Sequence, residues 1–250
     1  MLCEELKLTL PLLKLSMPFN NLKVFGLIPA RGGSKGIKNK NMVNINGRPL
    51  IDFTIDASRN SQYVDKTFLS SDSKIILAHG KNRNISIVER PHEYANDESS
   101  AVQVVFHFHD FLMANGVVAE GEDYYLTYLQ PTSPLRTAEI LDESFKILER
   151  SSEDSLISLV ENEYTPYKSF LLNDEGLVES LFEESLSNQN RQKLKKTYRA
   201  NGAIYTFLIS KFIQNNGFPS NFSQPFIMKS DESLDIDSYD DLDVLKSKFY

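Results

Sequence analysis

The sequence predicts an α/β fold built around a mainly parallel β-sheet. Short apolar runs alternate along the chain with segments of helical periodicity, which is the pattern of repeated strand–helix–strand units. The chain has 250 residues, of which 41% are apolar, and this is enough for one large domain with a full core. No linker rich in proline, glycine and serine divides the chain, and it contains no internal repeat. We therefore expect a single α/β domain.

The expected strands are short apolar runs that end in polar or glycine-containing segments. They are residues 24–28, 66–70, 85–88, 124–129 and 155–160, with a return strand over 203–208. Apolar residues spaced three and four apart predict helices over about 50–57 and 102–112. Thr137 is expected to cap a helix that continues through Arg150, and residues 238–248 are expected to form a C-terminal helix.

The pattern changes after about residue 161. Residues 168–172 and 177–178 flank an Asn-Asp-Glu-Gly turn and predict a β-hairpin, whereas residues 183–198 are polar and loop-like. We expect an excursion from the domain over about 161–200, after which the chain returns to the sheet. At the other end, residues 1–20 are expected to be an N-terminal extension, and the domain is expected to span 21–250.

Composition excludes several classes of function. The net charge of −7 argues against binding to nucleic acid or to an anionic membrane, and no apolar stretch is long enough to span a bilayer. The single cysteine, Cys3, excludes an intrachain disulfide and a cysteine-based zinc site, which suits a reducing cytoplasm. The sequence of residues 1–16 is interrupted by charges and by Pro11, so it is a poor secretory signal.

A loop with three glycines, one arginine and three lysines follows the first predicted strand. It runs from Arg31 to Lys40. Glycines let a backbone approach a ligand closely, and the cations favour a phosphate-rich ligand. The loop lacks the glycine spacing of kinase-type phosphate loops and of dinucleotide-binding folds. An ordinary basic turn is the alternative, and Lys35 and Lys38 fit solvated loop charges equally well.

Further polar segments follow the other predicted strands. Residues 71–72, 90–91 and 130–136 each come directly after a strand. In open α/β sheets, ligands bind beyond the carboxyl ends of the strands, so we expect these segments to meet the first loop at one edge of the sheet. Near the C-terminus, Asp235 and Asp237 lie two apart in an extended run, so both carboxylates can face one Mg²⁺ ion. The alternative is that these acids complement the start of the following helix.

Four segments, in this order, resemble the signature of the acylneuraminate cytidylyltransferases, the CMP-sialic acid synthetases, which include the legionaminic and pseudaminic acid cytidylyltransferases. They are ARGGSKG at 30–36 followed by Lys40 and Asn41, QPTSPLR at 130–136, RANGAIY at 199–205 and LDID at 234–237. The resemblance implies a doubly wound sheet of the nucleotide-diphospho-sugar transferase type, with a β-hairpin excursion that builds a homodimer. It also implies Mg²⁺-dependent transfer of CMP from CTP to the anomeric hydroxyl of a nine-carbon α-keto acid sugar, with release of pyrophosphate.

The resemblance also implies roles for individual residues. Those implied in nucleotide binding are Arg31, Ser34, Lys40, Asn41, Arg90, Ser100 and Gln130. Those implied in sugar binding are Gln130, Lys168, Arg191, Arg199, Asn201 and Tyr205. Arg31, Lys40 and Asp237 are the implied catalytic residues, and Asp235 and Asp237 the implied metal ligands.

Some of these roles have alternatives. Arg90 is equally placed in the sequence to pair with Glu93, and Arg191 lies in a lysine-rich loop whose charges fit simple solvation. The family tends to place a serine near Ala101, whereas Ser100 comes slightly earlier. Arg136 fits either a functional or a purely structural turn. Arg191 is a candidate to act across a dimer interface.

We therefore expect CTP and a nonulosonic acid (sialic, legionaminic or pseudaminic acid) as substrates, with no nucleic-acid or membrane partner. Three other functions explain part of the sequence. A sugar transferase would use Asp235 and Asp237 but not the Arg31–Lys40 loop. A catalytically silent protein would bind CTP without turnover. A cytidylyltransferase for an eight-carbon keto sugar would differ only in its acceptor.

Overall fold

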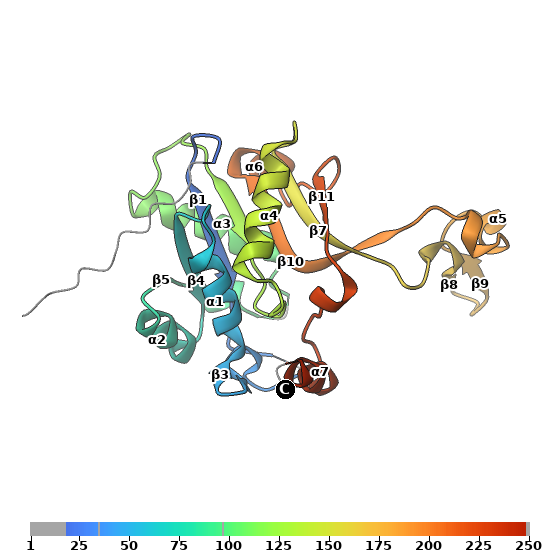
Figure 1. Cartoon of the computed structure of the whole chain (residues 1–250), viewed down its shortest axis with the longest axis horizontal. Coiled ribbons are helices and arrows are strands. Elements are labelled where there is room, and N and C mark those ends of the chain that lie inside the picture. Colours follow the sequence, from blue (N-terminus) through green and yellow to red (C-terminus); the bar gives the residue numbers. More distant parts are fainter. Residues whose placement is uncertain (1–18, 35, 97, 249–250) are drawn as a thin grey trace, which may run out of the picture.

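The computed structural model describes residues 19–34, 36–96 and 98–248. A seven-stranded sheet forms the centre of the molecule (Figure 1). Its strands are β1 (Val24–Pro29), β4 (Lys66–Ser71), β5 (Ser86–Glu89), β6 (Tyr125–Tyr128), β7 (Ser155–Glu161), β10 (Tyr198–Leu208) and β11 (Gln224–Ile227). They lie in the order β11-β7-β10-β6-β1-β4-β5. Only β10 runs antiparallel to its neighbours, which confirms the predicted mainly parallel sheet.

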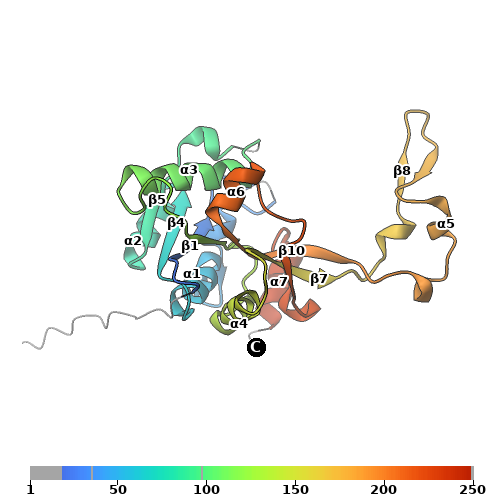
Figure 2. The same cartoon turned by 90° about the horizontal axis from the view of Figure 1, so that it is seen from above.

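Helices cover both faces of the sheet, as expected for a doubly wound fold (Figure 2). One face carries α1 (Leu50–Asn60), α2 (Lys74–Asn82) and α4 (Ala138–Glu149), and the other carries α3 (Ala101–Ala114) and α6 (Ile209–Asn215). Phe108 of α3 and Phe212 of α6 share one core cluster with β1, whereas Ile55 of α1 packs with Ile76 of α2. Thr137 caps α4 as predicted, since its side chain accepts a hydrogen bond from the Ile140 backbone.

A small separate core joins the first loop to the C-terminal segment. The C-terminal helix α7 (Tyr239–Ser247) contributes Leu242, which packs with Ile37 of the first loop and with Ile236. Short elements lie beside this core: η1 (Lys40–Met42), β2 (Asn44–Ile45) and β3 (Arg48–Pro49). Because Ile236 is fully buried there, its neighbours Asp235 and Asp237 are brought to the first loop.

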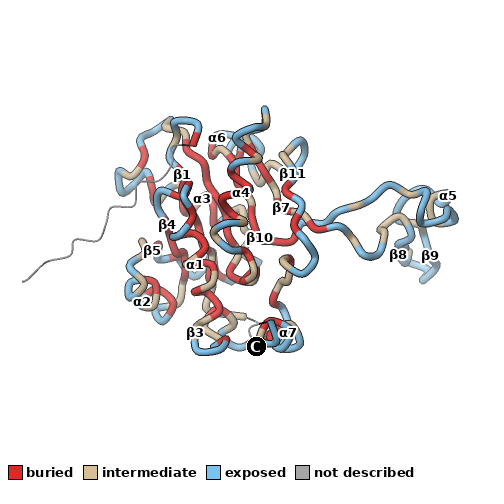
Figure 3. Tube along the Cα trace, viewed as in Figure 1, coloured by how far each residue is buried: buried red, intermediate tan, exposed pale blue. Residues whose placement is uncertain are grey.

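The excursion after β7 projects from the body as an arm, here the stretch of residues 162–197 (Figures 1 and 2). It holds η3 (Pro166–Lys168), β8 (Phe170–Leu172), β9 (Val178–Ser180), α5 (Glu184–Ser187) and η4 (Arg191–Lys193). The antiparallel pair of β8 and β9 confirms the predicted hairpin. The arm is largely exposed, in contrast to the buried strands of the body (Figure 3).

Several features differ from the prediction. Strand β11 and the helices α2, α5 and α6 were not among the expected elements, and β10 begins at Tyr198 rather than at residue 203. Pro225 argues against a strand in the sequence, because proline is rare inside sheets. Proline is tolerated on an edge strand, however, and β11 forms an edge of the sheet. Among the described residues, no helix has the length and apolar character needed to cross a membrane.

The expected N-terminal extension lies outside the described residues except for Phe19 and Asn20. Phe19 is fully buried, and its ring packs edge-on against Tyr125 and Phe145. The domain therefore includes residues before the expected boundary at 21, because an aromatic residue that precedes the first strand completes the core beside α4.

Candidate active site

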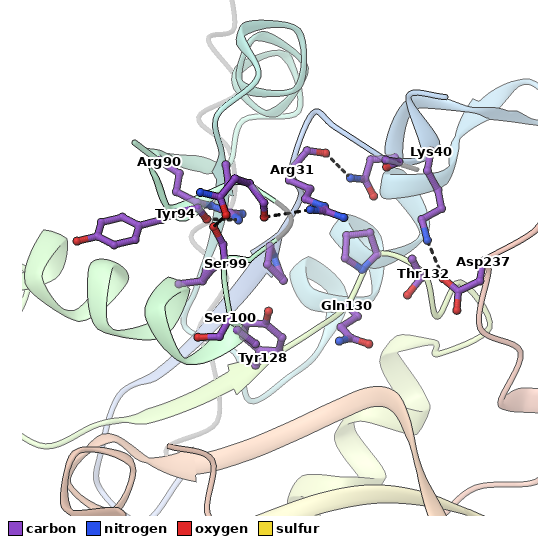
Figure 4. A pocket seen from close by; sticks show the side chains of 18 of the residues that line it. Arg31, Lys40, Arg90, Tyr94, Ser99, Ser100, Tyr128, Gln130, Thr132 and Asp237 are labelled. Carbon is purple, nitrogen blue, oxygen red and sulfur yellow. Dashed lines mark hydrogen bonds and ion pairs between the residues drawn. The ribbon is translucent and has the colours of Figure 1, made fainter. Parts of the chain in front are cut away.

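A cleft of about 490 Å³ opens beyond the carboxyl ends of β1, β5 and β6 (Figure 4). It brings together residues that are far apart in the sequence but were all predicted to bind the nucleotide or a metal. They are Arg31, Ser34, Lys40, Asn41, Arg90, Ser100, Gln130, Asp235 and Asp237. The expectation that polar segments after separate strands meet at one edge of the sheet is therefore confirmed.

Hydrogen bonds to its own chain hold the start of the first loop. The Gly32 backbone N–H donates to Asp72 Oδ1 (2.8 Å), and the buried Asn41 side chain donates to the Arg31 carbonyl (3.0 Å). The Arg31 guanidinium reaches across to donate to the Asn96 carbonyl (3.1 Å), so it spans one side of the cleft. These hydrogen bonds tie Arg31 and Gly32 to three other segments of the chain.

Lys40 stands at the other end of the cleft, beside the C-terminal segment. Its Nζ lies 2.9 Å from Asp237 Oδ1 and 2.8 Å from the Ile236 carbonyl (Figure 4). A Cβ added at Gly36 would lie 2.6 Å from the Asp237 carbonyl oxygen. Gly36 is therefore needed for the close packing of two protein segments, which differs from the direct ligand approach that the sequence suggested.

Asp235 contains a buried oxygen whose hydrogen-bonding capacity is unused. Within the described part of the chain, Asp235 Oδ1 has no hydrogen-bond partner. Burial raises the pKa of this carboxyl group, and hydrogen bonding from Thr132 opposes the shift. Because Ile236 donates its N–H to the Thr132 carbonyl (2.9 Å), the segment is held in place with Asp235 and Asp237 both on the cleft.

These two carboxylates fit a divalent cation that also binds substrate oxygens. An orphaned buried carboxylate oxygen is suited to a hard cation such as Mg²⁺. No group of three or more His, Cys, Asp or Glu side chains among the described residues could hold a metal by itself. The helix-start role proposed as the alternative belongs instead to Asp241, which accepts hydrogen bonds from the Ser238 backbone (2.7 Å) at the start of α7.

Arg90 forms part of the opposite wall and is almost fully buried. It donates to the Ser70 carbonyl (2.7 Å), the Ser70 hydroxyl (3.2 Å) and the Tyr94 carbonyl (3.3 Å). The alternative ion pair with Glu93 is therefore wrong, because neutral acceptors take up these donors. Burial lowers the pKa of Arg90, so this cation would gain from an anionic or carbonyl group in the cleft.

Small and aromatic side chains complete this wall. Ser100 is the N-cap of α3, where its hydroxyl accepts from the Gln103 backbone (3.2 Å), and Tyr128 lies beneath it at the end of β6. Sequence reasoning missed Tyr94, Asn96, Tyr128 and Thr132 as cleft residues. Tyr128 and Thr132 lie two residues on either side of Gln130, so a search that covered every residue at the end of a predicted strand would have found them. Tyr94 and Asn96 lie in or near a short turn, η2 (His92–Tyr94), whose sequence shows no recognisable binding motif.

Of the six predicted sugar-binding residues, only Gln130 lines the cleft in the described structure, and three of the others lie on or next to the arm. Lys168 is in η3 and Arg191 is in η4, both on the arm, and Arg199 is exposed near the start of β10. The Arg191 guanidinium donates to the Glu163 carbonyl within the arm. None of the three lines the cleft in the described structure.

Asn201 is buried in the body, so direct sugar contact in this chain is contradicted. Its Oδ1 accepts from the Ser158 hydroxyl (2.6 Å) and the Ala203 N–H (3.2 Å). Its Nδ2 donates to the Ser233 hydroxyl (3.0 Å) and approaches Met228 Sδ (3.1 Å). Both ends of the amide are already engaged, which gives Asn201 a structural role that the sequence pattern alone could not distinguish from ligand binding.

Tyr205 and Arg136 support the cleft from behind. The Tyr205 ring packs against those of Tyr128 and Phe218, at centroid distances of 6.4 and 5.5 Å. Burial raises the pKa of Tyr205, and the nearby Asp235 adds to the shift. Arg136 is fully buried, and this lowers its pKa to about 9. Of the two possibilities left open for Arg136, the structure therefore favours the structural one.

The chain is similar to known cytidylyltransferases. A model of the cytidylyltransferase family matches residues 25–238. The N-acylneuraminate cytidylyltransferase of Escherichia coli is 29% identical over 89% of this chain and 51% of its own length. The CMP-N,N'-diacetyllegionaminic acid synthase of Legionella pneumophila is 30% identical over 87% of this chain and 92% of its own length.

The coverage of these relatives differs. The chain spans about half the length of the Escherichia coli protein. Among solved structures, CMP:2-keto-3-deoxy-manno-octonic acid synthetase complexed with CTP superposes with a TM-score of 0.64 at 13% identity, covering 91% of this chain and 98% of the other. At that identity the superposition establishes a shared fold.

Proposed function

The chain belongs to the cytidylyltransferase family, and from that premise we propose that it transfers CMP from CTP to the anomeric hydroxyl of a nine-carbon α-keto acid sugar. One observation carries the proposal: a single cleft holds the cations Arg31, Lys40 and Arg90 together with two adjacent carboxylates. Relatives named for N-acylneuraminate and for diacetyllegionaminic acid support a nonulosonic acid as the acceptor.

The cations of the cleft would bind and orient CTP. Arg31 and Lys40 are suited to the triphosphate, because guanidinium and ammonium groups form strong charge-assisted hydrogen bonds with phosphate oxygens. Arg90, Ser100 and Tyr128 would surround the cytidine at the other end. The acceptor oxygen forms a bond to the α-phosphorus, the bond from that phosphorus to the β-phosphate oxygen breaks, and pyrophosphate leaves. The hydroxyl proton is released to the medium.

Positioning and charge stabilisation would provide most of the catalysis. Arg31 and Lys40 would stabilise the negative charge that moves onto pyrophosphate, and they are already held in the cleft by Asn96 and Ile236. Such prearranged groups need little reorganisation during the reaction. No covalent enzyme intermediate is required by this arrangement.

Mg²⁺ is part of the proposal. Asp235 and Asp237 would hold it, and the unpartnered Oδ1 of Asp235 supports this assignment. When bound, Mg²⁺ neutralises phosphate charge and lowers the pKa of a coordinated hydroxyl group. The chain's own contribution is to keep both carboxylates at the end of the cleft through the buried Ile236.

We also propose a homodimer in which the arm completes the sugar site of the partner. The arm exposes a group of large apolar side chains, each more than half exposed: Tyr164, Phe170, Leu171, Leu172, Leu177 and Val178. Exposed apolar groups of this size usually mark an interaction surface. Lys168, Arg191 and Arg199 would then act at the partner's cleft. A cytoplasmic location is supported by the single cysteine in the sequence.

A pyrophosphate-release assay with CTP tests the function. The acceptor panel is N-acetylneuraminic, legionaminic and pseudaminic acids, with the eight-carbon 3-deoxy-manno-octulosonic acid beside them and UTP as the matched nucleotide control. We expect turnover with CTP and at least one nine-carbon acid. Turnover with the eight-carbon sugar alone would show that the acceptor is an eight-carbon rather than a nine-carbon sugar. CTP binding without turnover would indicate a catalytically silent nucleotide-binding protein.

A further inference from the structure

Strand β10 contains an irregular stretch beside the cleft. Its pairing register with β7 shifts between Ala200 and Tyr205, and within this bulge Gly202 has a φ of +75°. Only glycine adopts that region readily, because any Cβ would be strained. Asn201 anchors the bulge from behind through its hydrogen bond with Ser158, described above. The bulge is therefore a fixed feature of the strand.

The loop after β6 contacts the backbone of the bulge on both sides of Gly202. The Ser133 hydroxyl lies 3.5 Å from the Asn201 carbonyl, and Arg136 donates to the Ala203 carbonyl (2.7 Å). The same Arg136 nitrogen lies 3.3 Å from the Gln130 carbonyl, at the start of the loop. The loop that carries Gln130 is thus tied to the two residues that flank Gly202.

The side chain of Gln130 rests against Gly202 itself. An ideal Cβ at Gly202 would overlap Gln130 Oε1, and it would lie 3.6 Å from the Ser133 hydroxyl. In the part of the chain that the structure describes, no hydrogen bond holds the Gln130 amide. Packing against Gly202 therefore sets where this amide lies. Figure 4 shows Gln130 on the β10 side of the cleft, across from Arg31 and Lys40.

We propose that Gly202 is a positioning residue that holds the Gln130 amide where it can bind the acceptor sugar. The absent side chain at Gly202 provides the space, and the two flanking hydrogen bonds keep that space next to Gln130. Because Gln130 lies opposite the cations that suit the triphosphate, its amide serves the acceptor rather than the phosphates. This inference rests on the proposed function, because it requires a sugar acceptor in the cleft.

Gly121 provides a matched control for backbone strain. Its φ of +76° is nearly the same as that of Gly202, but a Cβ at Gly121 would meet nothing within 4 Å. Gly121→Ala therefore introduces the same kind of strain without any contact to Gln130. A purely structural role for Gly202 would make the two alanine variants behave alike.

The experiment is a double-mutant cycle on Gly202→Ala and Gln130→Ala, with acceptor kinetics at saturating CTP. We expect Gly202→Ala to lower kcat/KM for the acceptor about tenfold, the effect of losing one well-placed hydrogen bond, with CTP affinity unchanged by calorimetry. Gly121→Ala should keep the native kinetics. In the Gln130→Ala background, Gly202→Ala should have no further effect, since the residue that it displaces is gone.

Native acceptor kinetics in Gly202→Ala would overturn the inference, and so would an equal loss with and without Gln130. If Gly202→Ala fails to fold, Ser158→Ala provides a milder change, because it loosens the bulge from outside the cleft. It should reduce acceptor use in the native background and not in Gln130→Ala. A crystal structure of either variant needs no substrate: an unmoved Gln130 amide overturns the inference even if no nonulosonic acid is turned over.

Discussion

The cleft and the arm differ in where they place their charged residues. In the cleft, Arg31, Lys40 and Arg90 each donate a hydrogen bond to a backbone carbonyl of the same chain. On the arm, which is largely exposed (Figure 3), Lys168 and Arg191 lie on short helical turns, and neither lines the cleft. The comparison separates two predicted sites: the predicted nucleotide-binding residues gather in one cleft, whereas Lys168 and Arg191, predicted to bind the sugar, do not line it.

The largest expected effect tests the carboxylates of the cleft. Asp235→Asn and Asp237→Asn should each lower kcat by roughly 100-fold or more, because each removes a charge next to the phosphates, while the melting temperature stays near native. Turnover measured across a Mg²⁺ titration checks this. Asp240→Asn is the control, since Asp240 is exposed and lies outside the cleft. Near-native activity in both variants at limiting Mg²⁺ would refute the metal assignment.

A smaller effect is expected at the cation end. Lys40→Ala should lower kcat/KM for CTP by about tenfold, because one charge-assisted contact to the triphosphate is lost. Lys38→Ala, in the same loop but exposed and outside the cleft, should change little. If the two variants have the same kinetics, Lys40 does not bind the nucleotide.

A substitution on the arm should affect use of the acceptor but not binding of CTP. Arg191→Ala should raise KM for the acceptor several-fold and leave CTP binding unchanged, whereas Lys193→Ala on the same turn should behave like the native protein. If the arm acts on its partner, mixing Arg191→Ala subunits with inactive Asp237→Asn subunits should restore activity, because one hybrid site is intact. Heterodimers verified by mass that show no recovered activity would exclude this, as would a monomer in solution.

The smallest expected effect is on the pH dependence of stability. It concerns the body of the protein, because all four histidines lie outside the arm. Burial lowers the pKa of His107, the nearby Arg90 lowers it further and Asp110 opposes them. The folded-state pKa therefore lies below the unfolded value, so this stabilisation is complete above about pH 6.5 and is lost as pH falls. Melting temperatures from about pH 7.5 to about pH 5 should fall less in His107→Gln than in the exposed His92→Gln. Equal slopes would contradict the prediction.

Local patterns predicted the parts of the fold that depend on local physics. Apolar runs and helical stripes located the central strands and the helices α1, α3 and α4, because buried parallel strands and amphipathic helices have distinct periodicities. They missed β11, which contains Pro225, and they missed α2 and α6, which are too short to show a full helical stripe. Phe19 was missed because a single core residue before the first strand has no periodicity.

In the site, too, the sequence located some residues correctly and could not settle the role of others. Residues such as Arg31 and Arg90 were found because they follow strands whose ends meet at one edge. Asn201 was assigned to the sugar through the family resemblance of residues 199–205, and a sequence does not show whether an asparagine amide is free or fully hydrogen-bonded. Only the three-dimensional partners of the side chain make that distinction, and those partners come from β7 and from the segment after β11.

The ion pair between Lys40 and Asp237 has a consequence for how ligands enter. At rest, the two charges neutralise each other at 2.9 Å. A triphosphate alone would draw Lys40 away and leave Asp237 uncompensated, and a divalent cation alone would do the reverse. Nucleotide and cation should therefore bind with positive free-energy coupling, each raising the affinity for the other by the same factor. Mn²⁺ affinity measured with and without an unreactive CTP analogue gives that factor, and in Lys40→Ala the factor should shrink. If the factor is above one, the cleft would select the nucleotide–metal complex over either ion by itself.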